Sequence, residues 1–112
     1  MSAITTHVLD VSRGRPVRGI VVILERAGSP QSTVLARATT DADGRVRAFS
    51  PAPTLEAGVH RLTFEVGAYF AASSVEAFYP RVVVEFELRD AAQHYHVPLL
   101  LSPFGYSTYR GS

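Results

Sequence analysis

The sequence predicts an all-β fold, a β-sandwich of seven to eight short strands with one short helix. Three observations support this prediction. Apolar and β-branched residues gather in short runs, glycine, proline and aspartate separate these runs, and only one segment has the character of a helix. The segments expected to form strands are residues 4–9, 19–24, 34–39, 45–49, 60–66, 81–88 and 93–101.

Turn residues set the limits of the first three predicted strands. Residues 4–9 are rich in β-branched side chains and end before a stretch at 12–16 that contains serine, glycine and proline. Residues 19–24 form an almost continuous apolar run. The segment Gly28-Ser29-Pro30 separates this run from the next strand, at 34–39.

Residues 41–44, with the sequence DADG, predict a tight turn, because aspartate can bond to its own backbone and glycine can take a positive φ. Residues 45–49 are therefore expected to return antiparallel to 34–39 as a hairpin. Arg45 and Arg47 follow the turn. They are expected on opposite faces of the strand, so that only one of them can share a face with a given site.

The second half of the chain continues the pattern. Residues 60–66 alternate between apolar and polar side chains, which is typical of a half-buried strand. Residues 68–75 are the expected helix. Pro80 precedes the valine-rich strand at 81–88, and residues 93–101 form the last expected strand.

Length and composition limit the class of protein. The chain has 112 residues, which suits one domain over residues 1–112, and 46% hydrophobic with 19% charged residues is a globular composition. A net charge of +1 gives no reason to expect nucleic acid as a partner, and the lack of cysteine excludes disulfides. The sequence shows neither a signal peptide nor a membrane-spanning run of roughly 20 apolar residues. We therefore expect a soluble, cytoplasmic protein without membrane contact.

Four histidines are candidates for proton transfer, because imidazole titrates closest to neutral pH. His94 and His96 are expected on one face of a strand, and His7 lies in the first strand. His60 is expected to be a partly buried, hydrogen-bonded structural residue. A zinc site of His7, His94 and His96 is the less favoured interpretation, because no carboxylate or cysteine accompanies them at a ligand spacing. We expect no bound metal.

The C-terminal segment, residues 94–112, reads HYHVPLLLSPFGYSTYRGS. Chain ends usually fray, but an apolar strand followed by aromatic, hydroxyl and cationic side chains is expected to dock on the domain and to contribute to a site. The serines of the segment do not lie in a Gly-x-Ser-x-Gly motif, so covalent catalysis by serine is not indicated.

This segment, together with HVLDVSRGRPV at residues 7–17 and TTDADGR at 39–45, resembles the 5-hydroxyisourate hydrolases, the transthyretin-related proteins of purine degradation. The resemblance spans essentially the whole chain. It implies a transthyretin-like (prealbumin-like) sandwich that assembles as a homotetramer, a dimer of dimers, with active sites in clefts where subunits face one another. It also implies a hydrolase without a cofactor.

The resemblance carries over to individual residues by their place in these motifs. The residues that match the catalytic group are His7, Arg45, His96 and Ser112, and those that match the substrate-binding signature are Tyr109, Arg110 and Gly111. Histidine suits proton transfer, and arginine suits the charge that develops on a ring oxygen. Ser112 is expected to orient an imidazole or the water, through either its hydroxyl or its free carboxylate. His94 is expected to be a neighbour of this group.

The expected activity is hydrolysis of 5-hydroxyisourate to 2-oxo-4-hydroxy-4-carboxy-5-ureidoimidazoline in urate degradation. The alternative is a non-catalytic, transthyretin-like protein that binds a small ligand, and a third interpretation is a structural, immunoglobulin-like module. The presence of paired imidazoles with an arginine favours the hydrolase over the carrier, because a carrier of hydrophobic ligands does not need these polar groups.

Overall fold

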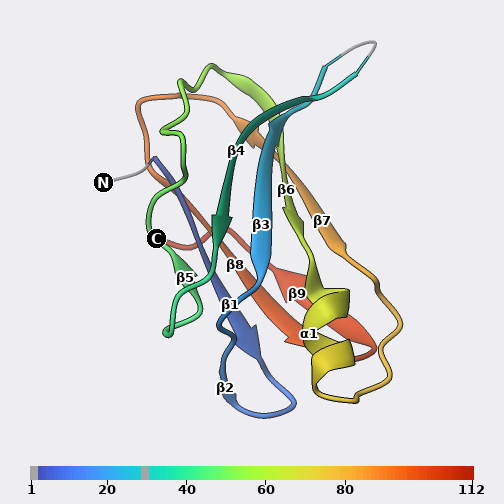
Figure 1. The fold of residues 1–112 in the computed structure, drawn as a ribbon. Coiled ribbons are helices and arrows are strands. Elements are labelled where there is room, and N and C mark those ends of the chain that lie inside the picture. Colours follow the sequence, from blue (N-terminus) through green and yellow to red (C-terminus); the bar gives the residue numbers. More distant parts are fainter. Residues whose placement is uncertain (1–2, 29–30) are drawn as a thin grey trace.

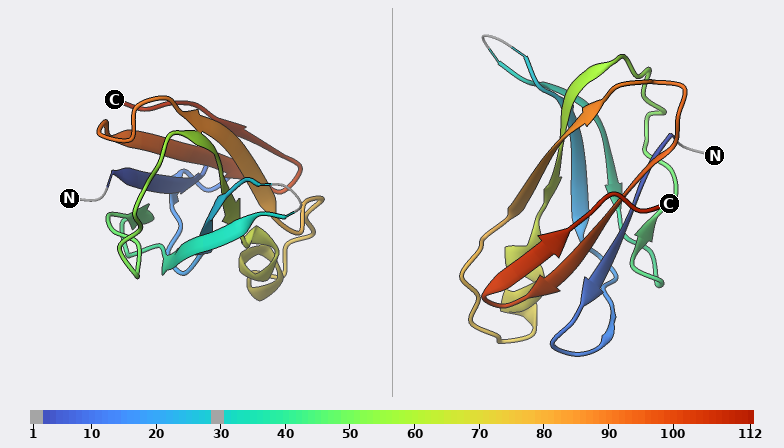
Figure 2. Two further views of the ribbon diagram at one scale, coloured as in Figure 1. Left: turned by 90° about the horizontal axis from the view of Figure 1, so that it is seen from above. Right: turned by 180° about the vertical axis from the view of Figure 1, so that it is seen from behind.

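The computed structural model describes residues 3–28 and 31–112, which form a sandwich of two sheets (Figures 1 and 2). Nine strands and one helix lie in these two ranges. In chain order they are β1 (Ile4–Asp10), β2 (Arg15–Pro16), β3 (Val21–Arg26), β4 (Thr33–Thr39), β5 (Arg45–Val46), β6 (Gly58–Phe64), α1 (Val66–Ala72), β7 (Val82–Leu88), β8 (Tyr95–Ser102) and β9 (Gly105–Thr108).

One sheet has the order β2-β1-β8-β9, with β5 also paired to β1, and the other has the order β4-β3-β6-β7. Strands β1 and β8 run parallel, and their register extends from Ile4 opposite Tyr95 to Asp10 opposite Leu101. Figure 1 shows β1 between β5 and β8, and the view from behind in Figure 2 shows the same neighbours. Three segments that are far apart in the sequence therefore lie side by side.

Strand β1 is amphipathic in the way that its sequence predicts. Ile4, Thr6, Val8 and Asp10 are buried, whereas the residues between them are half-buried on the outer face of the sheet. The buried positions face a core of branched aliphatic and aromatic side chains from both sheets. This alternation leaves the intervening side chains of β1 available for a site on the outer face.

The predicted fold class is confirmed, with two strands more than the seven predicted ranges. Strand β2 has two residues and lies in the stretch at 12–16 that was expected to form a turn. Strand β9 extends the C-terminal segment antiparallel to β8, from Ser102 opposite Gly105 to Leu99 opposite Thr108. The ends of the other strands differ from the predicted ranges by a few residues.

The helix begins earlier than predicted, at Val66–Ala72 in place of residues 68–75. Its buried side chains are Val66 and Phe70, which are one helical turn apart and face the core. The backbone N–H of its second residue donates a hydrogen bond to the Pro80 carbonyl at 2.9 Å. Packing of the first turn against the segment before β7 therefore sets where the helix begins.

The predicted hairpin between residues 34–39 and 45–49 is wrong. The turn itself forms, with Gly44 at φ 75°, but strand β5 pairs with β1 and not with β4. The Gly44 carbonyl accepts a hydrogen bond from the backbone of Val8 at 2.7 Å, so the chain crosses to the other sheet at the turn. A single bridge joins Arg37 of β4 to Ser50, one residue beyond the predicted strand at 45–49. The crossing places Arg45 opposite His7.

Ser29 and Pro30, which belong to the predicted turn before the third strand, lie outside the described residues. Within the ranges that are described, no helix combines the length and the apolar character needed to cross a membrane.

Candidate active site

The outer face of the sheet around β1 collects most of the predicted catalytic side chains. Arg45 of β5 lies opposite His7 of β1, and His96 of β8 lies opposite Thr5 of β1. Thr5 and His7 are two positions apart on one strand and therefore share a face. Paired residues of neighbouring strands also share a face. The register thus brings His7, Arg45 and His96 together.

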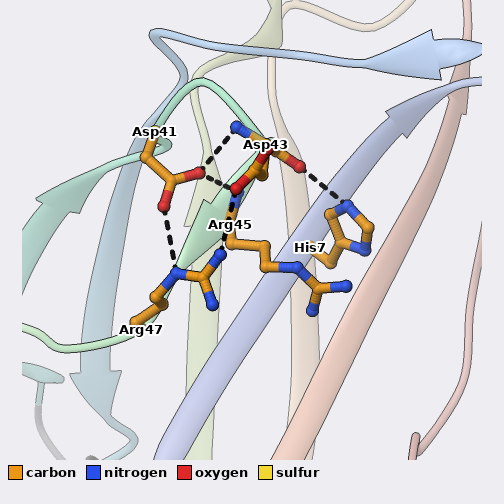
Figure 3. Close-up of polar contacts among 5 residues, drawn as sticks. All are labelled: His7, Asp41, Asp43, Arg45 and Arg47. Carbon is orange, nitrogen blue, oxygen red and sulfur yellow. Dashed lines mark hydrogen bonds and ion pairs between the residues drawn. The ribbon is translucent and has the colours of Figure 1, made fainter.

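His7 is held by the turn that precedes β5. Its Nε2 lies 2.8 Å from the backbone oxygen of Asp43 (Figure 3). A carbonyl oxygen only accepts hydrogen bonds, so Nε2 carries a hydrogen and the neutral ring has its lone pair on Nδ1. Burial and the charge of Arg45 lower the pKa of His7, while the Asp43 backbone and the carboxylates of Asp41 and Asp43 oppose this shift.

The two arginines that follow the turn differ in their contacts with its carboxylates. Asp41 and Asp43 bind the guanidinium of Arg47 at 3.3 and 3.1 Å. Figure 3 shows the guanidinium of Arg45 extending over β1, away from these carboxylates and without a drawn contact. The contact that Arg45 makes with the Asp41 side chain comes from its backbone N–H, which donates to the carboxylate at 3.0 Å. Arg45 therefore presents a cation that no carboxylate of the turn neutralises.

His96 is oriented through its other ring nitrogen. Its Nδ1 lies 2.8 Å from the hydroxyl of Thr5. Burial, and then the positive charges of Arg45, His7 and His94, lower the pKa of His96, while a hydrogen bond to the Thr5 backbone acts in the opposite direction. The neutral imidazole, which can accept a proton, is therefore favoured near neutral pH.

His94 contacts the same hydroxyl. Its Nε2 lies 3.0 Å from Thr5 Oγ1, and its ring is stacked with that of His96 at a centroid separation of 6.5 Å. The expectation that His94 neighbours the catalytic group fits this position. Thr5 is not among the predicted site residues, although its place two residues before His7 on a strand puts both side chains on one face.

A groove of about 340 Å³ lies over these residues, a size that accommodates a small heterocycle. The residues that line it are Thr5, Thr6, Arg45, Val46, Arg47, His94, His96 and Ser112. His7 does not line the groove itself, but it lies opposite Arg45, which does. The expectation that Arg45 and Arg47 lie on opposite faces is wrong, because both line the groove, as expected for residues two apart on an extended chain.

The C-terminal tail docks beside His96, as the sequence predicts. The backbone N–H of Gly111 donates to the His96 carbonyl at 2.8 Å. A Cβ on Gly111 would lie 2.6 Å from Cδ2 of His96, which is closer than real Cβ atoms come to other atoms. Glycine is therefore required where the tail passes the ring, and this contact places Ser112 at the groove.

A Gly111→Ala variant is expected to lower kcat by at least about tenfold, because displacement of a reacting group by even 1 Å costs up to about 10²-fold. The matched control is Gly105→Ala in the same segment, where a Cβ would meet its nearest atom at 3.7 Å and should be tolerated. Steady-state kinetics and thermal unfolding of both variants test this. Equal activity in the two variants would contradict a steric role for Gly111.

Tyr109 and Arg110 lie elsewhere. Both line a second cavity, of about 410 Å³, between β7 and the C-terminal segment. The guanidinium of Arg110 packs over the Tyr95 ring at 4.5 Å and donates a hydrogen bond to Gln93 at 3.3 Å. Of the residues predicted to bind substrate, the subunit thus brings Gly111 against His96, but neither Tyr109 nor Arg110 to the groove.

His60 has a structural position. It is fully buried in the core, and its Nδ1 lies 3.0 Å from the Gly58 carbonyl. His60 therefore lies apart from the groove. In the described part of the chain, no group of three or more histidine, cysteine, aspartate or glutamate side chains is arranged to hold a metal ion.

Comparisons with known proteins agree with this architecture. A sequence model of the HIUase/Transthyretin family matches residues 4–111. A 5-hydroxyisourate hydrolase of Caulobacter vibrioides is 45% identical over the full length of both chains, and a probable 5-hydroxyisourate hydrolase of Caenorhabditis elegans is 47% identical over 99% of this chain and 82% of its own.

Two solved structures are also similar. The 5-hydroxyisourate hydrolase of Klebsiella pneumoniae superposes with a TM-score of 0.84 at 43% identity, over 97% of this chain and 98% of that one. Sea bream transthyretin in complex with thyroxine superposes with a TM-score of 0.87 at 27% identity, over 97% of this chain and 94% of that one. By sequence and by fold, this chain belongs to the HIUase/transthyretin family.

Proposed function

We propose that the protein is a 5-hydroxyisourate hydrolase that converts its substrate to 2-oxo-4-hydroxy-4-carboxy-5-ureidoimidazoline in urate degradation. The observation that carries the proposal is that the register of three distant segments brings His7, Arg45 and His96 to one face of the sheet, where Arg45 and His96 line a groove. Relatives that are 45–47% identical and bear this name support it.

The reaction adds one water across a ring C–N bond. The water oxygen bonds to the carbonyl carbon, the C–N bond breaks, and the nitrogen leaves with a hydrogen. His96 takes the proton of the water and returns a proton to the departing nitrogen. A neutral imidazole suits both steps, which typically contribute about 10²–10⁴-fold to the rate.

Arg45 stabilises the negative charge that develops on the carbonyl oxygen as water attacks. Its guanidinium is a planar fork of donors that stays charged, and it has no carboxylate partner in the turn. The Asp43 carbonyl holds Nε2 of His7, so that the lone pair on Nδ1 of His7 can accept a hydrogen bond beside Arg45 and His96. Ser112, which lines the groove, orients the water or an imidazole. These roles use no metal and no cofactor.

We also propose that the protein assembles as a dimer of dimers whose clefts complete the site. The groove is open in one subunit, and Tyr109 and Arg110 lie outside it. Large aromatic side chains support assembly, because Phe78 is 70% and Phe104 65% exposed. Light scattering is expected to give a tetramer, and a fully active monomer would contradict the shared cleft.

The alternative function is a non-catalytic carrier of a small ligand, as the similarity to transthyretin allows. Arginine and histidine line the groove, and this polarity favours hydrolysis over the capture of an apolar ligand. The carrier interpretation predicts stoichiometric binding without turnover.

The proposed activity is tested with 5-hydroxyisourate that is generated from urate in the cuvette by urate oxidase. The absorbance of the intermediate is followed with and without the protein. Acceleration of its decay, at protein concentrations far below that of the substrate, is expected. An unchanged decay with folded, assembled protein would overturn the proposed function.

A further inference from the structure

We propose that Thr5 is a positioning residue that sets the tautomer of His96. Its hydroxyl accepts a hydrogen bond from Nδ1–H of His96 and donates its own hydrogen to Nε2 of His94. This leaves Nε2 of His96 unprotonated. The inference rests on the proposed hydrolytic function, for which it supplies the residue that makes His96 a base.

The geometry links the two imidazoles through one hydrogen. Thr5 Oγ1 lies 2.8 Å from Nδ1 of His96 and 3.0 Å from Nε2 of His94. A hydroxyl has a single hydrogen, so when it donates to one ring it can only accept from the other. Donation to His94 therefore puts the hydrogen of His96 on Nδ1. Donation to His96 would put that hydrogen on Nε2, and the neutral ring could then not accept a proton there.

The surroundings of His96 keep its ring neutral, with a single hydrogen whose place depends on the Thr5 hydroxyl. Burial is the largest cause that lowers the pKa of His96. Arg45 on β5, His7 on β1 and His94 on β8 all lower it, so a second hydrogen on the ring is disfavoured. The carboxylates of the turn before β5, Asp41 and Asp43, are bound to Arg47. The C-terminal carboxylate belongs to Ser112, which lines the groove together with His96.

Thr5 is well placed for this role. It lies directly opposite His96 in the parallel ladder of β1 and β8, so the backbone fixes the distance between them. Its β-branched side chain has few rotamers on a strand, which keeps the hydroxyl in place. His94 is exposed, so its Nδ1–H is free to bond to water while its Nε2 accepts from Thr5.

The first test compares Thr5→Val, which keeps the shape and removes the hydroxyl, with Thr5→Ser, which keeps the hydroxyl. Thr5→Val is expected to lower kcat about 10–100-fold, the range found for partners that orient working imidazoles at metal sites, with little change in KM. Thr5→Ser should retain most of kcat. A loss of equal size in both variants would overturn the role of the hydroxyl.

The second test measures the tautomer itself, without substrate. The ¹⁵N shifts of histidine ring nitrogens distinguish Nδ1–H from Nε2–H, and a His96→Asn sample assigns the signals. Wild-type His96 is expected as the Nδ1–H tautomer, and Thr5→Val should increase the Nε2–H form. An Nε2–H tautomer in the wild type, or no change in Thr5→Val, would overturn the proposal whatever the enzymatic activity.

The third test concerns the link to His94. His94→Phe removes the acceptor and frees Thr5 to donate to His96, so kcat should fall and the Nε2–H form should increase. On the alkaline side of the acid decline, where the direct effect of His94 on the pKa of His96 does not change kcat, His94→Phe should have no further effect on kcat in a Thr5→Val background, and additive losses there would refute this link. Should Thr5→Val not fold, Thr5→Ser and His94→Phe still give the kinetic and spectroscopic comparison. A wild-type protein that lacks hydrolase activity but shows the expected tautomer would count against the proposed function alone.

Discussion

A His96→Asn variant is expected to lose about 10²–10⁴-fold in kcat, the usual contribution of general acid–base catalysis. Asparagine is the suitable replacement because its amide can still bond to the Thr5 hydroxyl, which His96 contacts at 2.8 Å. The variant therefore keeps the local structure and removes the group that takes the proton. Steady-state kinetics with 5-hydroxyisourate measure the loss, and thermal unfolding verifies the fold.

The pH dependence gives this prediction a second measurement. Burial and the charges of Arg45, His7 and His94 lower the pKa of His96 from its ordinary value of 6.5. The acid decline of the wild-type kcat/KM, in which His96 takes up a proton, should therefore have its midpoint below pH 6.5. This acid decline should be absent from the residual activity of His96→Asn. A variant with wild-type kcat would exclude His96 as the base.

The sequence predicts the outer face of β1 well, because the information is local. Alternation of apolar and polar residues in residues 4–10 places His7 away from the core. The docking of the tail is also local in origin, since residues 94–101 carry both the apolar strand and the histidine that Gly111 contacts.

The strand that carries Arg45 shows where local information ends. The residues of the turn specify a turn, and the turn forms. They do not specify which sheet receives the next strand, because that depends on the bond between Gly44 and Val8, two residues far apart in the sequence. A Cβ on Gly44 would lie 2.5 Å from the Val8 carbonyl oxygen, so glycine also permits this approach.

The role of Thr5 could not be predicted for the same reason. Its place two residues before His7 puts both side chains on one face, but threonine is common in strands and this place alone does not distinguish it from a residue that only favours β structure. Its contact with two histidines depends on the parallel register of β1 and β8, whose partners are separated by most of the chain. Such pairing is a property of the folded sheet.

An Arg45→Met variant is expected to lower kcat/KM by about 10²–10³-fold, the cost of removing one donor to a developing oxyanion. The kcat/KM of Arg45→Lys should lie between those of Arg45→Met and the wild type, because lysine keeps the charge and loses the planar fork of donors. Arg47→Met is the matched comparison. Its guanidinium also lines the groove but is already bound to Asp41 and Asp43, so its removal should cost less.

Removal of the Arg45 charge should also move the pH profile. The guanidinium lowers the pKa of both His7 and His96, because it repels a protonated imidazole. In Arg45→Met this repulsion is lost, both pKa values rise, and the acid decline of kcat/KM should shift to higher pH. Arg45→Lys should leave the decline near its wild-type position. An unshifted profile in Arg45→Met would show that the cation and the imidazoles do not act on one another, and the joint site at β1, β5 and β8 would have to be abandoned.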